Sequence, residues 1–473
     1  MSYLGFEVYE KSINPIGSSV VFMAKEKNER VLIAAPAESG KPAPILGFTG
    51  EIHNGIFRAP LTHANGEVLR KLFPFTKPVR GLTQAKSFGT GDRLGIATPG
   101  HIQVFERYDV FPVFAQQSIR ELNLTDRTYE DVLDAATFGV FQEGFKSGFG
   151  ADGDHLKTIK DVEYALSLGF SMITLDCSDY IQPPPPDLPP LSAKYREAYL
   201  GKTFDIEGTP LVFTEPEAQQ CVAIYAGAIA FAAEVYNRFF GSRKYQGDFE
   251  ISIDETSTPT TPLQHFFVAQ ELLKAGVSFA TLAPRFCGEF QKGIDYKGDL
   301  DQFDQEVKIH AAIARHFGYK LSIHSGSDKF SVFPSIGRGT QGVFHVKTAG
   351  TSWLEAMRIV AAADPKLYRE IHSYALRVFH IATQYYQVTT DLKKIPPLDA
   401  LKDENLPALF ENNDARQLLH ITYGLILKGK HPDGSFIFKE RLYRLWRDRE
   451  ADYAEALARH IGKHLTFLGV APR

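Results

Sequence analysis

The strongest constraint on the fold is an alternation of short apolar runs with helical patterns that starts near residue 94. Because strand–helix alternation builds parallel sheets, and eight such units can close a ring, the pattern predicts an α/β protein with a (β/α)8 barrel of the TIM type. An open doubly wound sheet is the alternative, although no glycine-rich dinucleotide turn follows the first run. The expected strands are residues 94–100, 110–118, 148–155, 171–179, 249–255, 278–286, 320–326 and 343–350.

Different patterns flank this alternation at both ends of the chain. Residues 1–90 contain short apolar runs punctuated by Gly, Pro and Asn, which indicates a β-rich N-terminal region. We expect the barrel over residues 91–350, with an insertion at 177–220 that contains the stiff run QPPPPDLPP. Residues 351–473 show helical patterns throughout, so we expect a helical C-terminal region.

Composition and charge exclude several classes of function. The 473 residues include 52 Lys plus Arg and 56 Asp plus Glu, so the chain lacks the basic excess of a nucleic-acid binder. Three cysteines are too few for a disulfide framework. The N-terminal residues resemble no signal peptide, and the longest apolar stretch, 221–240, is interrupted by Gly and Glu. We therefore expect a cytoplasmic protein with neither a membrane span nor a nucleic-acid partner.

Polar residues gather where the expected strands end, which is the edge that carries the active site in barrels of this type. Period-2 alternation in FEISIDE, KLSIHSG and VFHVK points Asp254, His324, His345 and Lys347 towards the barrel axis. Inward polar groups are costly unless they bind something. The other polar residues at these strand ends that we expect to act on or bind a substrate or a metal are Gln116, Ser118, Asp152, Asp154, His155, Thr174, Glu255, Arg285, Ser325, Asp328 and Lys329.

Histidines and carboxylates converge at this edge, which suits a divalent metal. His155, His324 and His345 are the candidate ligands, and Zn²⁺ is favoured, with Mn²⁺ and Ni²⁺ as alternatives. The sequence contains neither an HExxH nor a CxxC motif, so the site is inferred from position in the fold. A hydrogen-bonded core residue is the alternative for any single histidine, and His345 could contact substrate instead.

Two turns at the same edge suit an anion. HSGSDKFS (324–331) and KTAGTS (347–352) combine Gly and Ser with Lys329 and Lys347, which offers backbone N–H groups and ammonium groups to a carboxylate or a phosphate. Ordinary loops with helix caps are the alternative.

A pair of carboxylates faces across the expected barrel. Asp154 and Glu255 could act as acid and base on opposite faces of a sugar carbon if their surroundings separate their pKa values. Ion pairing with Lys157 or Arg285 is the alternative.

Several segments resemble the tagaturonate epimerase family, and the resemblance runs over most of the chain. LSIHSGSDKFS is the most specific of them. The resemblance implies a metal-dependent enzyme that interconverts D-tagaturonate and D-fructuronate, with relatives that epimerise the neutral ketohexoses fructose and tagatose at C4. The segments are FGTGDRLGIATPGH (88–101), GFGADGDHLKT (148–158), ISIDETSTPT (251–260), SFATLAPRFCGEF (278–290) and LSIHSGSDKFS (321–331).

The same resemblance assigns roles to particular residues. It implies that Asp154 is the proton acceptor, that Glu255 is the proton donor, and that His155 and His324 are metal ligands, with His345 as our choice for the third ligand. Ser118, Thr174 and His345 are the residues expected to line the sugar. Lys329 and Lys347 are the expected partners of a substrate carboxylate.

The substrate chemistry narrows the mechanism. The inverted carbon is β to the ketone, so simple enolisation cannot reach its C–H bond. Retro-aldol cleavage, rotation of the aldehyde fragment and re-addition, with a metal as Lewis acid, is the favoured route. Transient oxidation by a nicotinamide would need a GxGxxG turn, which the sequence lacks.

Three other functions are alternatives to an epimerase. A metal-dependent, class II-like aldolase would share every feature but release its fragments. A non-catalytic sugar-binding module would not need converging histidines and carboxylates, and a hydrolase could use metal-bound water. The terminal regions could also serve as subunit contacts of a homo-oligomer.

Overall fold

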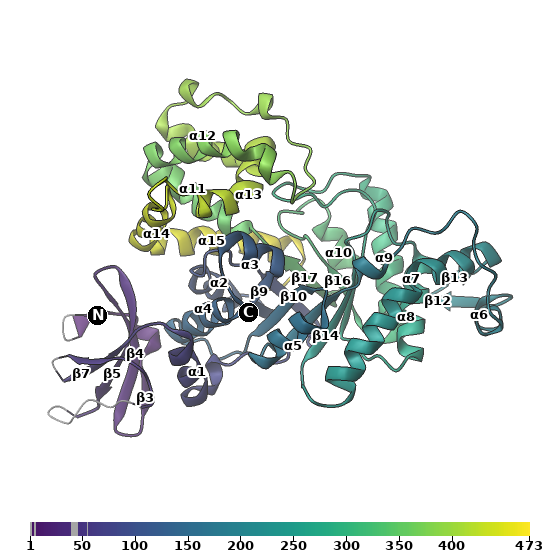
Figure 1. The fold of residues 1–473 in the computed structure, drawn as a ribbon, viewed down its shortest axis with the longest axis horizontal. Coiled ribbons are helices and arrows are strands. Elements are labelled where there is room, and N and C mark those ends of the chain that lie inside the picture. Colours follow the sequence, from purple (N-terminus) through teal and green to yellow (C-terminus); the bar gives the residue numbers. More distant parts are fainter. Residues whose placement is uncertain (1, 4–5, 39–45, 54) are drawn as a thin grey trace.

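The computed structural model describes residues 2–3, 6–38, 46–53 and 55–473. An antiparallel sheet, a central barrel and a group of C-terminal helices follow one another along the chain (Figure 1). The closed parallel barrel confirms the predicted fold class.

The N-terminal sheet is antiparallel, and its central strands bury side chains on both faces of the sheet. In β4, Val21 and Met23 pack into one apolar cluster, whereas Phe22 packs into another on the opposite face, as the period-2 alternation of a strand requires. The strands are β1 (Ser2–Tyr3), β2 (Phe6–Val8), β3 (Asn14–Ile16), β4 (Ser19–Glu26), β5 (Glu29–Pro36), β6 (Glu51–His53) and β7 (Ile56–Ala59), in the order β1-β2-β4-β5-β7-β6 with β3 on β4.

Eight parallel strands close the barrel. The last strand pairs with the first, with Phe344 opposite Lys86, which leaves no free edge in this ring. The strands are β8 (Lys86–Thr90), β9 (Phe111–Ser118), β10 (Gly150–Leu156), β11 (Met172–Asp176), β14 (Asp248–Ile253), β15 (Thr281–Pro284), β16 (Lys320–Ile323) and β17 (Phe344–Thr348).

Helices cover the outside of the barrel. Thr128, Thr214 and Thr261 each open a helix with a capping box, in which the threonine side chain and a residue three positions later satisfy free backbone N–H groups. The helices that lie between the N-terminal sheet and the C-terminal region in sequence are α1 (His63–Leu72), α2 (Thr98–Phe105), α3 (Ile119–Thr125), α4 (Tyr129–Gln142), α5 (Ile159–Ser167), α7 (Glu215–Tyr236), α8 (Pro262–Lys274), α9 (Leu300–Phe317) and α10 (Phe333–Gly339), with the short elements η2 (Pro74–Thr76) and η4 (Asn237–Gly241). Another short element, η1 (Glu10–Ser12), packs against β4 of the N-terminal sheet.

The first barrel strand differs from the prediction. Residues 94–100 form a turn and the start of α2, whereas β8 lies earlier, within the segment assigned to the N-terminal region. The Asp92 carboxylate accepts hydrogen bonds from the N–H groups of Leu94 and Ala97 at 3.0 and 2.8 Å, which turns the chain away from the barrel. The apolar residues of this run are buried against C-terminal helices instead of a sheet.

The insertion after β11 carries its own small elements. It comprises η3 (Ser178–Tyr180), α6 (Ala193–Tyr199) and a hairpin of β12 (Thr203–Ile206) and β13 (Thr209–Val212), and it projects at the end of the molecule away from the N-terminal sheet (Figure 1). The chain then enters α7. By length and composition, residues 215–241 are apolar enough to cross a membrane, and α7 packs against α8 on the barrel.

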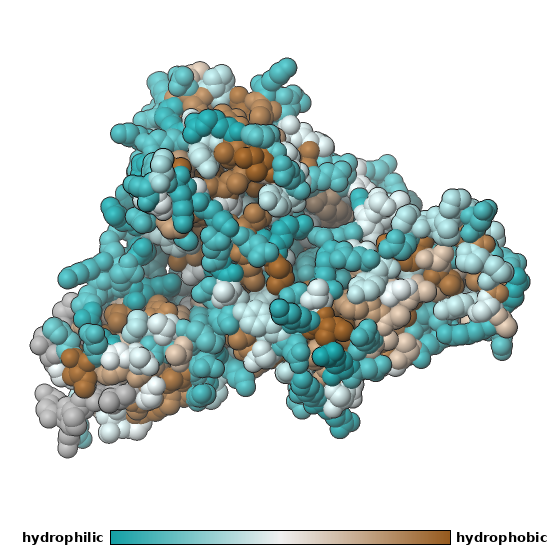
Figure 2. All heavy atoms as spheres, in the orientation of Figure 1, coloured by the Kyte–Doolittle hydropathy of each residue, from teal (hydrophilic) through white to brown (hydrophobic). Residues whose placement is uncertain are grey.

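The C-terminal region is helical, as predicted. Its helices have a separate apolar core around Trp353 and Trp446, and the last helix returns to pack along α2. Hydrophobic side chains are visible on the surface of this region (Figure 2), where Leu376 and Tyr385 are exposed. The elements are α11 (Thr351–Ala363), α12 (Pro365–Ala382), α13 (Asn413–Lys428), α14 (Lys439–Asp448) and α15 (Glu450–Phe467), with η5 (Leu392–Lys394), η6 (Leu398–Ala400) and η7 (Asp403–Glu411) between α12 and α13.

Candidate active site

A bulge in β10 aims His155 into the mouth of the barrel. The register between β10 and β11 shifts between Gly153 and Leu156, and His155 has a left-handed backbone with φ of 52°. Bulges redirect side chains, and strained residues of this kind gather at functional sites. The bulge lies in the glycine-rich strand sequence GADGDHL, and it directs His155 to the cavity.

Two histidines meet at this mouth, and a carboxylate orients each of them. The rings of His155 and His324 lie 4.9 Å apart between centroids. Asp176 contacts Nδ1 of His155 at 3.2 Å, and Glu250 contacts Nε2 of His324 at 2.8 Å. The second ring nitrogen of His324, Nδ1, lies 3.0 Å from Asp254. Ligand atoms of His155, Asp254 and His324 all lie within 4.8 Å of one another, so these three residues could hold a metal ion.

The electrostatic environment favours positive charge at the two rings. Burial lowers the pKa of His155, but the charge of Asp154 and the hydrogen bond with Asp176 outweigh it and raise that pKa to about 10. Burial also opposes charge on His324, yet the neighbouring Asp254 raises its pKa above the usual value. A field that attracts protons to histidine also attracts a divalent cation, because both place positive charge among the carboxylates.

His345, the third predicted ligand, does not join these residues. It lies opposite Ser322 in the sheet register, one inward layer below His324, and its Nδ1 contacts the Ser87 hydroxyl at 2.9 Å. Burial lowers its pKa to about 3. His345 therefore points inwards as predicted, but it lies too deep in the barrel to reach His155 and His324. Asp254 is the third residue of the cluster instead.

Lys347 lies at the centre of the buried carboxylates. Its Nζ is 2.6 Å from Asp152, 3.2 Å from Glu250 and 2.5 Å from the Thr174 hydroxyl, and it also pairs with Asp154. Burial disfavours the ionised form of Asp154, but the Lys347 charge dominates and lowers the pKa of that carboxyl below its usual value. These contacts cross the barrel and confirm the predicted inward direction of Lys347, which acts as an internal counter-charge.

Lys329 is also engaged internally. Its buried ammonium group donates to the backbone carbonyls of Gln291, Ile294 and Ser327 at 2.6 to 2.8 Å. Burial lowers its pKa to about 7. A buried cation needs such partners, so Lys329 stabilises the loop after β16. It does not line either cavity at the barrel mouth, where we expected it to bind an anion.

Asp328 likewise serves the loop after β16. Its carboxylate lies 2.7 Å from Nη2 of Arg416 on α13 and 2.5 Å from Nε2 of His460 on α15. The Asp328 N–H donates to Nε2 of His464 at 3.0 Å. The substrate contact that we expected for Asp328 is replaced by contacts with the C-terminal helices.

Two adjoining cavities open at the barrel mouth. The inner one has a volume of about 40 Å³ and the outer one about 250 Å³. Predicted residues that line the inner cavity are Gln116, Ser118, Asp154, His155, Glu255, His324, Ser325 and Lys347, and those that line the outer cavity are Asp254, Glu255, Arg285, His324 and Ser325. Asp152, Thr174, His345, Asp328 and Lys329 line neither of them.

Three residues that the sequence analysis missed line both cavities: Arg120, Lys292 and Tyr386. Arg120 lies in the first turn of α3, two positions after the end of β9, and Lys292 lies in the loop between β15 and α9, so both follow barrel strands at the edge where the active site of such barrels lies. Tyr386 comes from the segment after α12, and its hydroxyl contacts that of Tyr423 at 3.0 Å. No local signal in the C-terminal sequence indicates that Tyr386 would reach the barrel.

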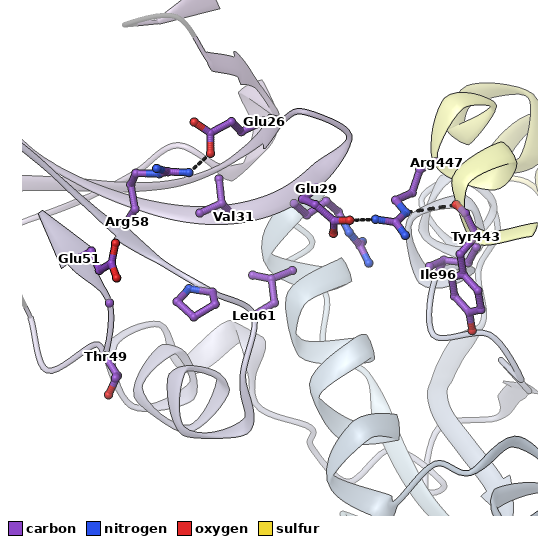
Figure 3. Close-up of a pocket in the computed structure, with 13 residues that line it drawn as sticks. Glu26, Glu29, Val31, Thr49, Glu51, Arg58, Leu61, Ile96, Tyr443 and Arg447 are labelled. Carbon is purple, nitrogen blue, oxygen red and sulfur yellow. Dashed lines mark hydrogen bonds and ion pairs between the residues drawn. The ribbon is translucent and has the colours of Figure 1, made fainter. Parts of the chain in front are cut away.

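A larger cavity lies outside the barrel, between the N-terminal sheet and α14 (Figure 3). It has a volume of about 870 Å³. Its charged residues pair with one another, Arg58 with Glu26 and Arg447 with Glu29 (Figure 3). The metal-competent groups found among the described residues do not include any residue of its lining, so the barrel mouth is the better catalytic candidate.

Comparisons with known proteins point to one family. The family model described as tagaturonate epimerase matches residues 9–468. A tagaturonate/fructuronate epimerase from Thermotoga maritima is 45% identical over 98% of this chain and 97% of its own length. Crystal structures of a fructuronate-tagaturonate epimerase from Cohnella laeviribosi, native and complexed with glycerol, superpose with a TM-score of 0.94 at 48% identity, covering 98% of this chain and 97% of theirs. The chain therefore belongs to the tagaturonate epimerase family of carbohydrate epimerases.

Proposed function

We propose that this protein interconverts D-tagaturonate and D-fructuronate at the mouth of its barrel. The observation that carries the proposal is the inner cavity, in which Asp154 and Glu255 line one space together with His155 and His324. Family membership supports the reaction, since relatives that match nearly the whole chain are named for it. Activity on the neutral ketohexoses D-fructose and D-tagatose is part of the proposal as a second substrate class.

A divalent metal fits the cluster of His155, Asp254 and His324. Asp176 and Glu250 each occupy one ring nitrogen of a histidine and leave the other nitrogen to face the cluster, which is the usual arrangement behind metal-binding histidines. We favour Zn²⁺, with Mn²⁺ and Ni²⁺ as alternatives, because imidazole and carboxylate ligands suit all three. When bound, the ion would supply Lewis acidity for the ketone oxygen.

The two carboxylates have different surroundings that suit different roles in a retro-aldol route. Asp154 is buried beside Lys347, which keeps it ionised and able to accept the proton of the substrate's carbinol hydroxyl. Cleavage of the adjacent C–C bond then leaves its electron pair on the ketone-bearing fragment as an enolate and yields an aldehyde, whose rotation presents its other face. The enolate carbon re-adds to this face and forms an alkoxide. Glu255, which is accessible to solvent and 3.2 Å from Arg120, passes a proton taken from solvent to the alkoxide oxygen, and Asp154 releases its proton to solvent to complete the cycle.

A paired assay tests the function. Elemental analysis of purified protein is combined with epimerisation of D-tagaturonate and D-fructose before and after chelation. We expect stoichiometric metal and activity that chelation abolishes and metal restores. Full activity in metal-free protein would contradict the metal proposal, and absence of conversion of both sugars would contradict the epimerase.

Isotope and trapping experiments test the route. Deuterium at the inverted carbon should be retained, because the C–H bond of that carbon is never broken in a retro-aldol sequence. A carbonyl trap should capture a three-carbon aldehyde during turnover. Exchange of the deuterium with solvent would contradict the route, and net release of fragments without a trap would favour the aldolase alternative.

The remaining proposals concern the setting of the enzyme. We propose a cytoplasmic protein that acts on a small sugar acid without nucleic-acid or membrane partners. A homo-oligomer is compatible with the exposed hydrophobic side chains of the C-terminal region, such as Leu376 and Tyr385 (Figure 2).

A further inference from the structure

The outer cavity carries positive charge that the chemistry described above does not use. Lys292 and Arg120 line both cavities, and they come from the loop between β15 and α9 and from the first turn of α3. Asp154 and His155 line the inner cavity only, so a sugar whose carbinol carbon lies beside them could extend one end towards Lys292. The hydrogen-bond donors around the outer cavity that have no acceptor indicate which chemical group this end of the sugar carries.

Lys292 differs from the two lysines that the sequence singled out. Lys347 is surrounded by carboxylates, and Lys329 donates to three carbonyl oxygens. By contrast, Lys292 Nζ makes a single hydrogen bond within the described part of the chain, to the Ser325 hydroxyl at 3.0 Å, and no carboxylate of the described residues lies within 4.0 Å of it. An ammonium group has three N–H donors, so two stay available for a ligand in the cavity.

The neighbouring arginine adds to this surplus. Arg120 Nη2 pairs with Glu255 at 3.2 Å, but its buried Nε has no hydrogen-bond partner in the described part of the chain. Burial and the Arg120 charge lower the pKa of Lys292, and the charges of Glu121 and Glu255 oppose this shift only in part. Arg285 also lines the outer cavity. The same cavity is also lined by three carboxylates, those of Asp254, Glu255 and Glu289. The features that favour an anion are therefore the donors of Lys292 and Arg120 that have no acceptor in the described part of the chain.

We infer that Lys292, assisted by Arg120, binds the carboxylate of the sugar acid in the outer cavity and sets the preference for a uronate over a neutral ketohexose. The inference rests on the proposed function. A carboxylate offers two oxygens to two adjacent cations, whereas the terminal CH₂OH group of a ketohexose offers no charge to match them. Lys292 is thus a specificity-determining residue, and proton transfer stays with Asp154 and Glu255.

The test compares sugars that differ at one end. D-Tagaturonate, D-tagatose and D-tagatose 6-phosphate are titrated calorimetrically into wild-type protein and into Lys292→Met, Lys292→Arg and Lys366→Met variants, with steady-state rates on D-tagaturonate. Lys366 is an exposed residue of α12 and serves as the matched control. In Lys292→Met we expect Kd and KM for D-tagaturonate to rise about 10- to 100-fold, the scale of losing a charged hydrogen bond, while D-tagatose affinity and kcat stay nearly constant.

The variants separate the outcomes. Lys292→Arg should recover most of the uronate affinity, and Lys366→Met should behave as wild type. An equal loss of affinity for both neutral and acidic sugars, a loss in kcat alone, or tighter binding of the phosphate than of the uronate would overturn the inference. If wild-type protein binds the uronate but does not convert it, the proposed function is contradicted. The ratio of the Kd values for D-tagaturonate in Lys292→Met and in wild type would still decide the role of Lys292.

Discussion

Two groups of histidines and carboxylates in this protein have similar spacing and different surroundings. His155, Asp254 and His324 form one at the barrel mouth, and Asp328, His460 and His464 form another under the C-terminal helices. In both groups, ligand atoms lie within 4.8 Å of one another. Spacing by itself therefore does not distinguish a catalytic centre from a structural contact.

The hydrogen bonds make the distinction. In the second group, His464 Nδ1 donates to the His460 carbonyl at 2.8 Å and its Nε2 accepts from the Asp328 N–H, so both nitrogens are occupied. Asp328 is neutralised by Arg416 at 2.7 Å. At the barrel mouth, His324 also has both nitrogens engaged, but one of its partners, Asp254, belongs to the group itself. His155 has only one nitrogen hydrogen-bonded to a carboxylate, and both histidine rings border a cavity. We conclude that the second group fastens α13 and α15 to the loop that follows His324.

Removing one histidine from each group tests whether only the group at the barrel mouth binds metal. We expect His324→Asn to abolish metal binding and to lower kcat/KM about 10³-fold, the scale of losing a group that stabilises charge in the transition state. His464→Asn should keep stoichiometric metal. Metal analysis with steady-state kinetics checks both variants, and equal metal loss in the two would show that the groups are not distinct.

The next effect concerns the counter-charge of the barrel mouth. Lys347→Met leaves Asp152 and Glu250 without their buried cation, and breaking such a pair costs about 3–5 kcal/mol of unfolding free energy. Lys308→Met removes an exposed pair with Asp304 on α9 and should cost less than about 1 kcal/mol. Urea denaturation measures both, and similar losses would contradict the central role of Lys347.

A smaller loss is expected at the second group. Asp328→Asn retains the shape of the side chain but removes the charge that faces Arg416 and His460. A hydrogen bond to a charged group contributes about 1.5–3 kcal/mol. Because the asparagine oxygen can still accept one of the two hydrogen bonds, the free energy of unfolding should fall by about the value of one bond, with metal content unchanged. Loss of metal from this variant would contradict the structural interpretation of the group.

The smallest effect is a dependence of stability on pH. Burial lowers the pKa of His464 to about 3, with a further contribution from His460, whereas an unfolded histidine titrates near about 6.5. Between these values the unfolded chain binds the extra proton, so acidification destabilises the fold by about 1.4 kcal/mol per pH unit for this group. His464→Asn should flatten the slope of unfolding free energy against pH by that amount, and an unchanged slope would contradict it.

Much of the barrel could be predicted from local patterns. Alternation in FEISIDE and KLSIHSG predicted the inward direction of Asp254 and His324 because side chains of a strand alternate between its faces. The first strand was wrong because apolar residues of 94–100 also suit a helix interface, and Asp92 turns the chain by hydrogen bonds that no periodicity reveals. The depth of His345 depends on strand register, which the sequence does not state.

The pairing of charges depended on the tertiary structure. Residue type and position in a strand were enough to place histidines, carboxylates and Lys347 at one edge of a barrel, because the repeating geometry of strand and helix is local. Which cations are neutralised inside the protein and which face the cavity depends on loops that meet across the barrel. Lys329 turned inwards to carbonyl groups, whereas Lys292 and Arg120 reached the cavities beside Tyr386, a residue from the C-terminal region. Electrostatic partners are set by distance in space, and only the folded chain decides that distance.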